Sequence, residues 1–203
     1  MRKVFISYYH KDAQYHKDAL TSLNDNWQLF VDTSVEIGDI NDEYLTDEQI
    51  RIKIRDEYIK DSDVLILLCG KNSKHRKHID WELHAAMYKS EAKDPIPILV
   101  FNLPDCSNYC RRNNKREGEI IEGGKPINWI SIDSYSEFKR YYPDLPERLL
   151  KSLANKKTPV TIVNLYSLTV EQIKELIEYS YQRRSQFEYD DSERLRRKNG
   201  DDE

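Results

Sequence analysis

Glu82 lies at the edge of the apolar face of a predicted helix, where a carboxylate can be tuned for chemistry. The stretch 75–87 (HRKHIDWELHAAM) runs from a basic loop into this helix. Four apolar residues recur there at the spacing of a core-facing stripe: Ile79, Leu83, Ala86 and Met87. Glu82 falls about 60° from Ile79 at ~100° per residue. Partial burial can shift the pKa of such an acid, so Glu82 is the candidate catalytic residue.

A second interpretation of Glu82 stays open at this point. The basic residues Arg76 and Lys77 precede it in the chain, and either could form a salt bridge with its carboxylate. Structural ion-pair networks perturb carboxylates as active sites do. The other groups that the fold brings to the same place must decide between the two.

Composition excludes several classes of protein. The chain has 203 residues, 38% of them hydrophobic and 33% charged, with a net charge of −4, which suits one domain with an appended element. A nucleic-acid-binding protein would show a strongly basic domain or face. No signal peptide is predicted, and the longest apolar run, Val64–Cys69, is far below the ~20 residues of a membrane span.

The cysteines predict neither disulfides nor a metal site. There are three, and Cys106 and Cys110 have no second Cys/His pair at zinc-site spacing nearby. From the cysteines we expect no metal ion and a reducing, cytoplasmic location. From the charge and the short apolar runs we expect no nucleic acid and no membrane among the partners.

Strand-like and helix-like segments alternate along the chain. Strands are predicted at 3–7, 27–31, 63–70, 97–102, 127–132 and 159–164. Helices are predicted at 12–24, 46–60, around Glu82, and after the capping residues Ser134, Asp144 and Thr169. This alternation predicts an α/β fold: an open, mainly parallel sheet of about five to six strands with helices on both faces.

The predicted domain organisation has three parts. Residues 1–155 form the main α/β domain, with a surface insertion at 104–126 where periodicity fails. Residues 156–187 form a C-terminal strand–helix extension, which either completes the sheet or packs beside it. Eleven of the sixteen residues in 188–203 are charged, which predicts a flexible tail.

Several polar groups should meet at the carboxyl ends of the strands, where open parallel sheets bind ligands. The first strand delivers Ser7, Tyr8, Tyr9 and His10, the second delivers Asp32 and the acidic loop 33–45, and the third leads through the basic loop 71–78 to Glu82. Each has a structural alternative: the tyrosines can cover the sheet edge, Asp32 can cap the next turn, and the loop can be simply solvated.

The absence of three well-known motifs counts against several classes of enzyme. There is no GxGxxG after the first strand, no GxxxxGK[ST] and no GxSxG. The acid, the aromatic rings and the polar loops that remain suit cleavage of an N-glycosidic bond in a nucleotide better than hydride or phosphoryl transfer.

The segment FISYYHKD (5–12), the strand ending in Asp32, the run DVLILL (63–68) and the pair Trp81-Glu82 resemble TIR domains. Among these they resemble the stand-alone TIR-like proteins of the bacterial Thoeris antiphage system, over about residues 2–103. The resemblance implies a TIR/flavodoxin-like fold, NAD as substrate without a further cofactor, and Glu82 as the catalytic carboxylate. It makes Ser7, Tyr8, Asp32 and Trp81 candidates to line the pocket, and Tyr9 is a further substrate-binding candidate.

The leading functional prediction is an NAD-cleaving enzyme of the glycohydrolase or ADP-ribosyl cyclase type. Its ADP-ribose-derived, cyclic product is expected to activate a separate effector in antiphage defence, with a phage protein as candidate trigger. The loop 33–45 corresponds to the segment that gates the pocket and mediates self-assembly in TIR domains, so a homo-oligomer is expected. Here the loop is acidic, which counts against simple attraction of an anionic dinucleotide by the loop. The alternatives are a non-catalytic TIR-type interaction module and a nucleotide hydrolase or deoxyribosyltransferase.

Overall fold

A five-stranded parallel sheet forms the centre of the protein. We describe it in a computed structural model that covers residues 1–34, 44–89, 94–109, 121–122, 125–126, 134–156, 158 and 160–200. The strand order is β2-β1-β3-β4-β7, and all four pairings are parallel. The strands are β1 (Lys3–Ser7), β2 (Val31–Asp32), β3 (Val64–Cys69), β4 (Ile98–Asn102) and β7 (Thr161–Asn164). The predicted α/β class is thereby confirmed.

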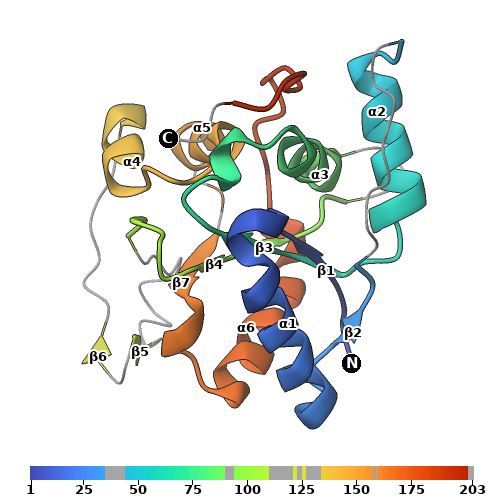
Figure 1. The fold of residues 1–203 in the computed structure, drawn as a ribbon. Helices are drawn as coiled ribbons and strands as arrows, with labels where there is room; N and C mark the ends of the chain where they lie inside the picture. Colours follow the sequence, from blue (N-terminus) through green and yellow to red (C-terminus); the bar gives the residue numbers. More distant parts are fainter. Residues whose placement is uncertain are drawn as a thin grey trace.

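Helices cover both faces of the sheet (Figure 1). The α-helices are α1 (His10–Trp27), α2 (Asp47–Lys53), α3 (Lys77–Met87), α4 (Tyr135–Tyr141), α5 (Glu147–Lys156) and α6 (Val170–Gln182). A π-helix, η1 (Ile54–Ile59), continues α2, and the 3-10 turns are η2 (Ser73–His75), η3 (Leu165–Ser167) and η4 (Arg184–Gln186). Helices α1 and α6 pack on one face, whereas α2, α3 and α5 pack on the other.

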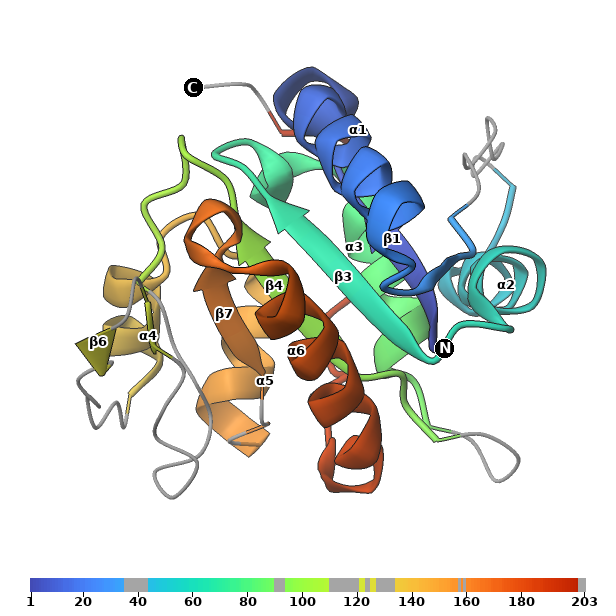
Figure 2. The same ribbon diagram turned by 90° about the horizontal axis from the view of Figure 1, so that it is seen from below.

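Strand periodicity decides which residue faces which layer. Successive side chains of a strand point to opposite faces, so Val4 and Ile6 contact the α1/α6 layer and Phe5 contacts the α3 layer. Ser7, two residues after Phe5, therefore faces α3. Figure 2 shows the strands running the same way, with α1 and α6 across the near face and α3 behind them.

Three of the four predicted capping residues cap a helix; the fourth, Asp144, instead accepts Ser107 N at 2.7 Å with its carboxylate. Gln49 N donates to the Thr46 side chain at 3.1 Å, and Thr46 N donates to the Gln49 side chain at 2.8 Å, a capping box at the start of α2. Ser134 caps α4, and Thr169 caps α6 with a second capping box. Local chemistry therefore predicts three helix starts correctly.

The second strand is shorter than predicted and begins later. Trp27 belongs to α1, which ends at Gln28 in the left-handed region (φ 49°). The Asn24 side chain then accepts the backbone N–H groups of Leu29 and Phe30, both at 2.9 Å. Because a side chain takes these donors, the backbone there does not pair with β1, and β2 is only Val31–Asp32.

The strand of the C-terminal extension belongs to the central sheet. β7 pairs with β4 from Leu99↔Thr161 to Asn102↔Asn164, and α6 returns across the sheet. A separate antiparallel pair joins β5 (Ile121–Glu122) and β6 (Lys125–Pro126). The predicted strand at 127–132, most of the insertion 104–126 and most of the loop 33–45 lie outside the described residues.

Residues 188–200 are not the flexible tail that their charge predicted. Tyr189 and Leu195 are 7% and 5% exposed and belong to the α3-side core. In Figure 1 this dark red segment rises between α5 and α3. Burial of apolar side chains spaced among the charges holds it in place.

Candidate functional site

A cavity of about 330 Å³ opens at the carboxyl end of β1, where the connections of neighbouring strands diverge. β1 is followed by α1 on one face, and the adjacent β3 is followed by α3 on the other. Such a switch point is where open α/β sheets bind ligands, and the volume lies in the range of ligand sites. The lining residues are Ile6, Tyr8, Tyr9, His10, Gln14, Lys17, Ser34, Arg76, His78, Ile79, Glu82 and Asn199.

Glu82 is the acid of this cavity. It is 7% exposed and lines the cavity beside Ile79, one turn earlier on α3. Ser7, which is 1% exposed, donates its hydroxyl hydrogen to Glu82 Oε2 at 2.5 Å. The end of β1 and the middle of α3 thus hold the carboxylate between them.

Burial decides the protonation of Glu82. Desolvation raises its pKa from the usual 4.5 to about 8, and the hydrogen bond from Ser7 acts in the opposite direction. Within the described part of the chain, neither Arg76 nor Lys77 forms an ion pair with Glu82. The geometry therefore favours the candidate catalytic acid over the salt-bridge interpretation.

Polar groups of the β1–α1 segment line part of the cavity. Gln14 Oε1 accepts the Tyr8 hydroxyl at 3.2 Å and lies 2.9 Å from His10 Nδ1. The rings of Tyr8 and His10 lie 4.7 Å apart, centroid to centroid. Tyr8 and Tyr9 both line the cavity.

Asp32 lies behind the lining. It accepts Ser34 N at 2.8 Å, which is the turn-capping role left open in the sequence, and it pairs with Lys17 Nζ at 3.7 Å. Ser34 Oγ in turn accepts Ile6 N at 2.8 Å. Asp32 therefore positions Lys17 and Ser34, which do line the cavity, and is not itself a lining residue.

Arg76, from the loop before α3, also lines the cavity. Its guanidinium carbon lies 4.0 Å from the centroid of the Tyr9 ring, a cation–π contact that orients the two side chains. His78 lines the cavity one turn before Glu82. The cations Lys17 and Arg76 thus lie on the same lining as the buried acid.

The structure corrects the prediction for Trp81. It was a candidate to line the pocket, but it is fully buried and its Nε1 donates to Arg196 O at 2.8 Å. One residue along a helix turns the side chain by about 100°. Trp81 therefore faces the C-terminal segment while Glu82 faces the cavity.

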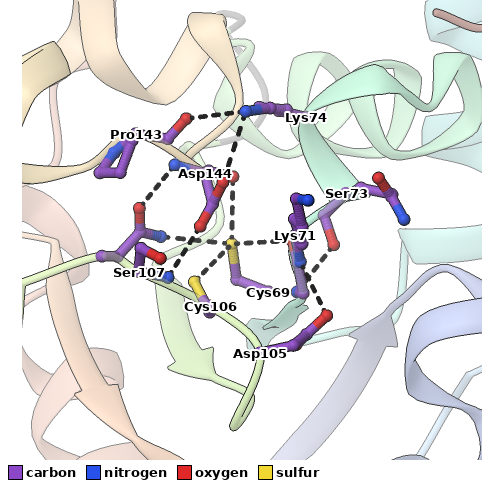
Figure 3. A network of polar contacts seen from close by, with 12 residues as sticks. Cys69, Lys71, Ser73, Lys74, Asp105, Cys106, Ser107, Pro143 and Asp144 are labelled. Carbon is purple, nitrogen blue, oxygen red and sulfur yellow. Dashed lines mark hydrogen bonds and ion pairs between the residues drawn. The ribbon is translucent and has the colours of Figure 1, made fainter. Parts of the chain in front are cut away.

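The loop between β3 and α3 is held at several points. Gly70 N donates to Ser73 Oγ at 3.0 Å, and Lys71 N donates to Asp105 Oδ2 at 3.2 Å. Lys74 Nζ lies 3.4 Å from Asp144 Oδ1 (Figure 3). These contacts fix the loop that carries Arg76 into the site.

Asp12 joins this loop to α1. Its Oδ2 accepts Asn72 N at 3.0 Å, and its Oδ1 accepts the Asn72 side chain at 3.2 Å. A Cβ on Gly70 would lie 3.0 Å from Asp12 Cβ, so glycine allows this close approach. The loop after β3 and the first turn of α1 are thereby joined.

Sequence reasoning missed part of the lining. His10 was expected at this edge of the sheet, but Gln14 and Lys17 were not. Together with His10 they follow the i, i+4, i+7 spacing of one helix face, and this polar stripe was a usable signal. Arg76 and His78 fall within the predicted basic loop. Asn199 carried no local signal, because only the packing of the C-terminal segment brings it to the cavity.

No cluster of His, Cys, Asp and Glu that could hold a metal ion occurs among the described residues. In the same part of the chain, no helix is both long and apolar enough to cross a membrane.

Comparison with known proteins identifies the family. No curated protein matches the chain. A family model described as "Thoeris protein ThsB, TIR-like domain" matches residues 5–107, about half of the chain, from β1 through the segment after β4. The match includes Ser7, Tyr8, Tyr9, Asp32 and Glu82. The chain therefore belongs to the TIR-like domain family of the Thoeris protein ThsB, which gives it a TIR-type role in antiphage defence.

Proposed function

We propose that the protein cleaves the nicotinamide–ribose bond of NAD and forms an ADP-ribose-derived, cyclic product that activates a separate effector. One observation carries the proposal: Glu82, the acid among the described lining residues, is buried, hydrogen-bonded to Ser7, and faces a ligand-sized cavity at the switch point of the sheet. Cleavage of this bond builds positive charge on the ribose, as glycoside cleavage does. Nicotinamide leaves as a neutral base, so one carboxylate suffices.

Glu82 has two roles in this reaction. As the nicotinamide–ribose bond breaks, the bonding electron pair goes to the nicotinamide nitrogen, and the ionised carboxylate of Glu82 stabilises the oxocarbenium-like ribose. An internal hydroxyl of the nucleotide then attacks the same carbon and gives up a proton. A carboxylate whose pKa is about 8 can accept that proton, because its basicity matches the working pH.

The cavity walls suit the rest of the dinucleotide. Lys17 and Arg76 are cationic, and Glu82 is the acid among the described lining residues. Cations attract the diphosphate, and the tyrosine rings Tyr8 and Tyr9 offer apolar faces for a base. NAD enters as a substrate, and no resident cofactor is required.

Product analysis tests the proposal. Purified protein is incubated with NAD and with a panel of nucleosides and deoxynucleosides, with and without extract of phage-infected cells, and the products are identified by mass spectrometry. We expect nicotinamide and an ADP-ribose-derived product from NAD alone. Release of bases from the nucleosides instead would indicate a nucleotide hydrolase or deoxyribosyltransferase.

A non-catalytic assembly module is the second candidate, favoured by exposed aromatic residues. Tyr15 and Trp27 on α1 and Tyr166 on η3 are 76%, 60% and 56% exposed. Aromatic side chains of this kind are enriched at protein interfaces. This candidate predicts concentration-dependent association with no turnover of NAD under any condition.

The pH profile gives a specific check on Glu82. Because kcat/KM reports ionisation in the free enzyme, we expect it to rise with pH through about 8 as Glu82 ionises. The Ser7 hydrogen bond lowers the pKa of Glu82, so Ser7→Ala should move this limb to higher pH. At pH 7 the loss in kcat/KM should be about tenfold, the effect of one hydrogen bond to a charged group, and it should shrink above pH 9. A uniform loss at every pH would assign Ser7 a different role.

A further inference from the structure

Residues 195–200, which we call the C-terminal clasp, cross α3 next to the catalytic carboxylate. Arg196 N donates to Asp80 Oδ2 at 2.8 Å, and Arg196 O accepts from Trp81 Nε1 at 2.8 Å. Asp80 and Trp81 immediately precede Glu82 on α3. The clasp therefore attaches to the same turn of helix that carries Glu82.

A buried arginine anchors the segment that leads into the clasp. Arg148 of α5 is fully buried and binds both oxygens of Asp80, at 3.0 and 3.1 Å. It also donates to the carbonyls of Glu193 and Arg194, at 2.8 and 3.1 Å. One guanidinium thus joins α5, α3 and the chain just before the clasp, and bidentate pairing of this kind is geometrically specific.

The end of the clasp lies on the first turn of α3. Gly200 N donates to His75 O at 2.8 Å, and Lys77 N donates to Asn199 Oδ1 at 3.0 Å. A Cβ on Gly200 would lie 2.8 Å from His75 Nδ1 and 3.1 Å from His75 Cβ. The close approach of the backbone at Gly200 holds Asn199 in position.

The Lys77 contact orients the Asn199 amide. Because a backbone N–H must meet an acceptor, the oxygen of the amide is the atom turned to the helix. Among the described residues, no acceptor takes the Nδ2 hydrogens of Asn199, which is exposed and lines the cavity. Two donors are therefore left for a ligand, on the same lining as Lys17 and Arg76.

Asn199 also lies outside the part of the chain that the family model covers. That match ends at residue 107, whereas the other described lining residues fall within it. The clasp thus adds to the shared cavity a group that this chain supplies from its own C-terminal segment.

From this geometry we infer that Asn199 is a ligand-binding residue: its Nδ2 donates to the diphosphate oxygens of the nucleotide, and the clasp holds it there. The inference rests on the proposed cleavage of NAD. Diphosphate is the favoured acceptor because the neighbouring lining cations bind the same group.

Asn199→Asp separates this role from a structural one. The aspartate keeps an oxygen for Lys77 N but removes both donors and brings a negative charge toward the diphosphate. We expect KM for NAD to rise by about tenfold or more, as loss of a charge-assisted hydrogen bond predicts, with kcat within about twofold. Asn199→Ala should show a rise of similar direction, and Lys198→Ala, in the clasp but outside the lining, should match the wild type.

A binding measurement tests the inference without turnover. Isothermal titration with ADP-ribose should show about tenfold weaker binding to Asn199→Asp than to the wild type and equal binding to Lys198→Ala. If the wild type binds ADP-ribose but releases no nicotinamide from NAD, the proposed reaction fails and the role of Asn199 is still decided. Equal affinity of Asn199→Asp and the wild type, or no binding of ADP-ribose to the wild type, overturns the inference.

Discussion

Glu82→Gln is expected to lower the rate of nicotinamide release from NAD by about 10³-fold or more, the scale for removal of a group that stabilises transition-state charge. Glutamine keeps the shape of the side chain and can still accept the Ser7 hydroxyl. It cannot carry the negative charge that stabilises the ribose cation, and it cannot take a proton. The measurement is the initial rate of nicotinamide formation at pH 8.5, where much of the wild-type carboxylate is ionised.

Glu175→Gln is the matched control for this change. Glu175 is exposed on α6, away from the cavity lining, and the substitution is chemically the same. Its rate should equal that of the wild type. Nicotinamide release that persists at the wild-type rate in Glu82→Gln would remove Glu82 from the mechanism and with it the proposed enzyme.

The same substitution should stabilise the protein at alkaline pH. The pKa of Glu82 is about 8 in the folded protein against the usual 4.5, so between these values the folded state binds more protons than the unfolded state. Stability is therefore fully present below about pH 4.5 and declines as pH rises through about 8. Glutamine does not titrate and escapes this loss. The shift corresponds to about 5 kcal/mol, the full advantage of Glu82→Gln above pH 8.

Urea unfolding at pH 5 and at pH 9.5 measures this difference. Near pH 5 the two proteins should differ little, because both side chains are uncharged when folded. At pH 9.5 the variant should have the larger free energy of unfolding, and Glu175→Gln should stay within about 0.5 kcal/mol of the wild type. A constant offset between Glu82→Gln and the wild type at both pH values would contradict the buried position of the carboxylate.

These two expectations have one physical cause. An acid held in an apolar site destabilises the fold when it ionises, and the same environment gives it the basicity and the charge that the reaction uses. The Ser7 hydroxyl moderates the burial by stabilising the ionised form. Activity lost and stability gained in one variant would be the signature of a functional residue, since a structural ion pair loses stability when it is cut.

Much of the fold follows from short stretches of sequence. The apolar run Val64–Cys69 predicted a strand buried on both faces, and it is the central strand β3. The capping boxes at Thr46 and Thr169 predicted the starts of α2 and α6 because a cap is satisfied within four residues. Glu82 was likewise placed by the periodicity of its own helix. All of these features arise from near neighbours in the chain, so the order of the residues is enough to predict them.

Other features depend on contacts between distant parts of the chain. One local contact was also missed: the strand predicted from Trp27 is short because the Asn24 side chain, five and six residues away, takes two backbone donors that strand pairing would use. Trp81 was predicted to line the pocket, but it instead anchors the clasp, because a residue of the clasp more than a hundred positions away accepts its indole N–H. Composition predicted a flexible tail at 188–203, yet a few apolar residues spaced among the charges hold residues 188–200.

By itself, then, the sequence determined the alternation of strands and helices, the helix starts and the acid at the border of α3. Tertiary structure alone decided that this acid is desolvated, that Ser7 is its partner and that Asn199 completes the wall in front of it. The physical reason is range: helix and strand patterns arise within a few residues, whereas burial and the pKa of a carboxylate are set by every segment that displaces water from around it.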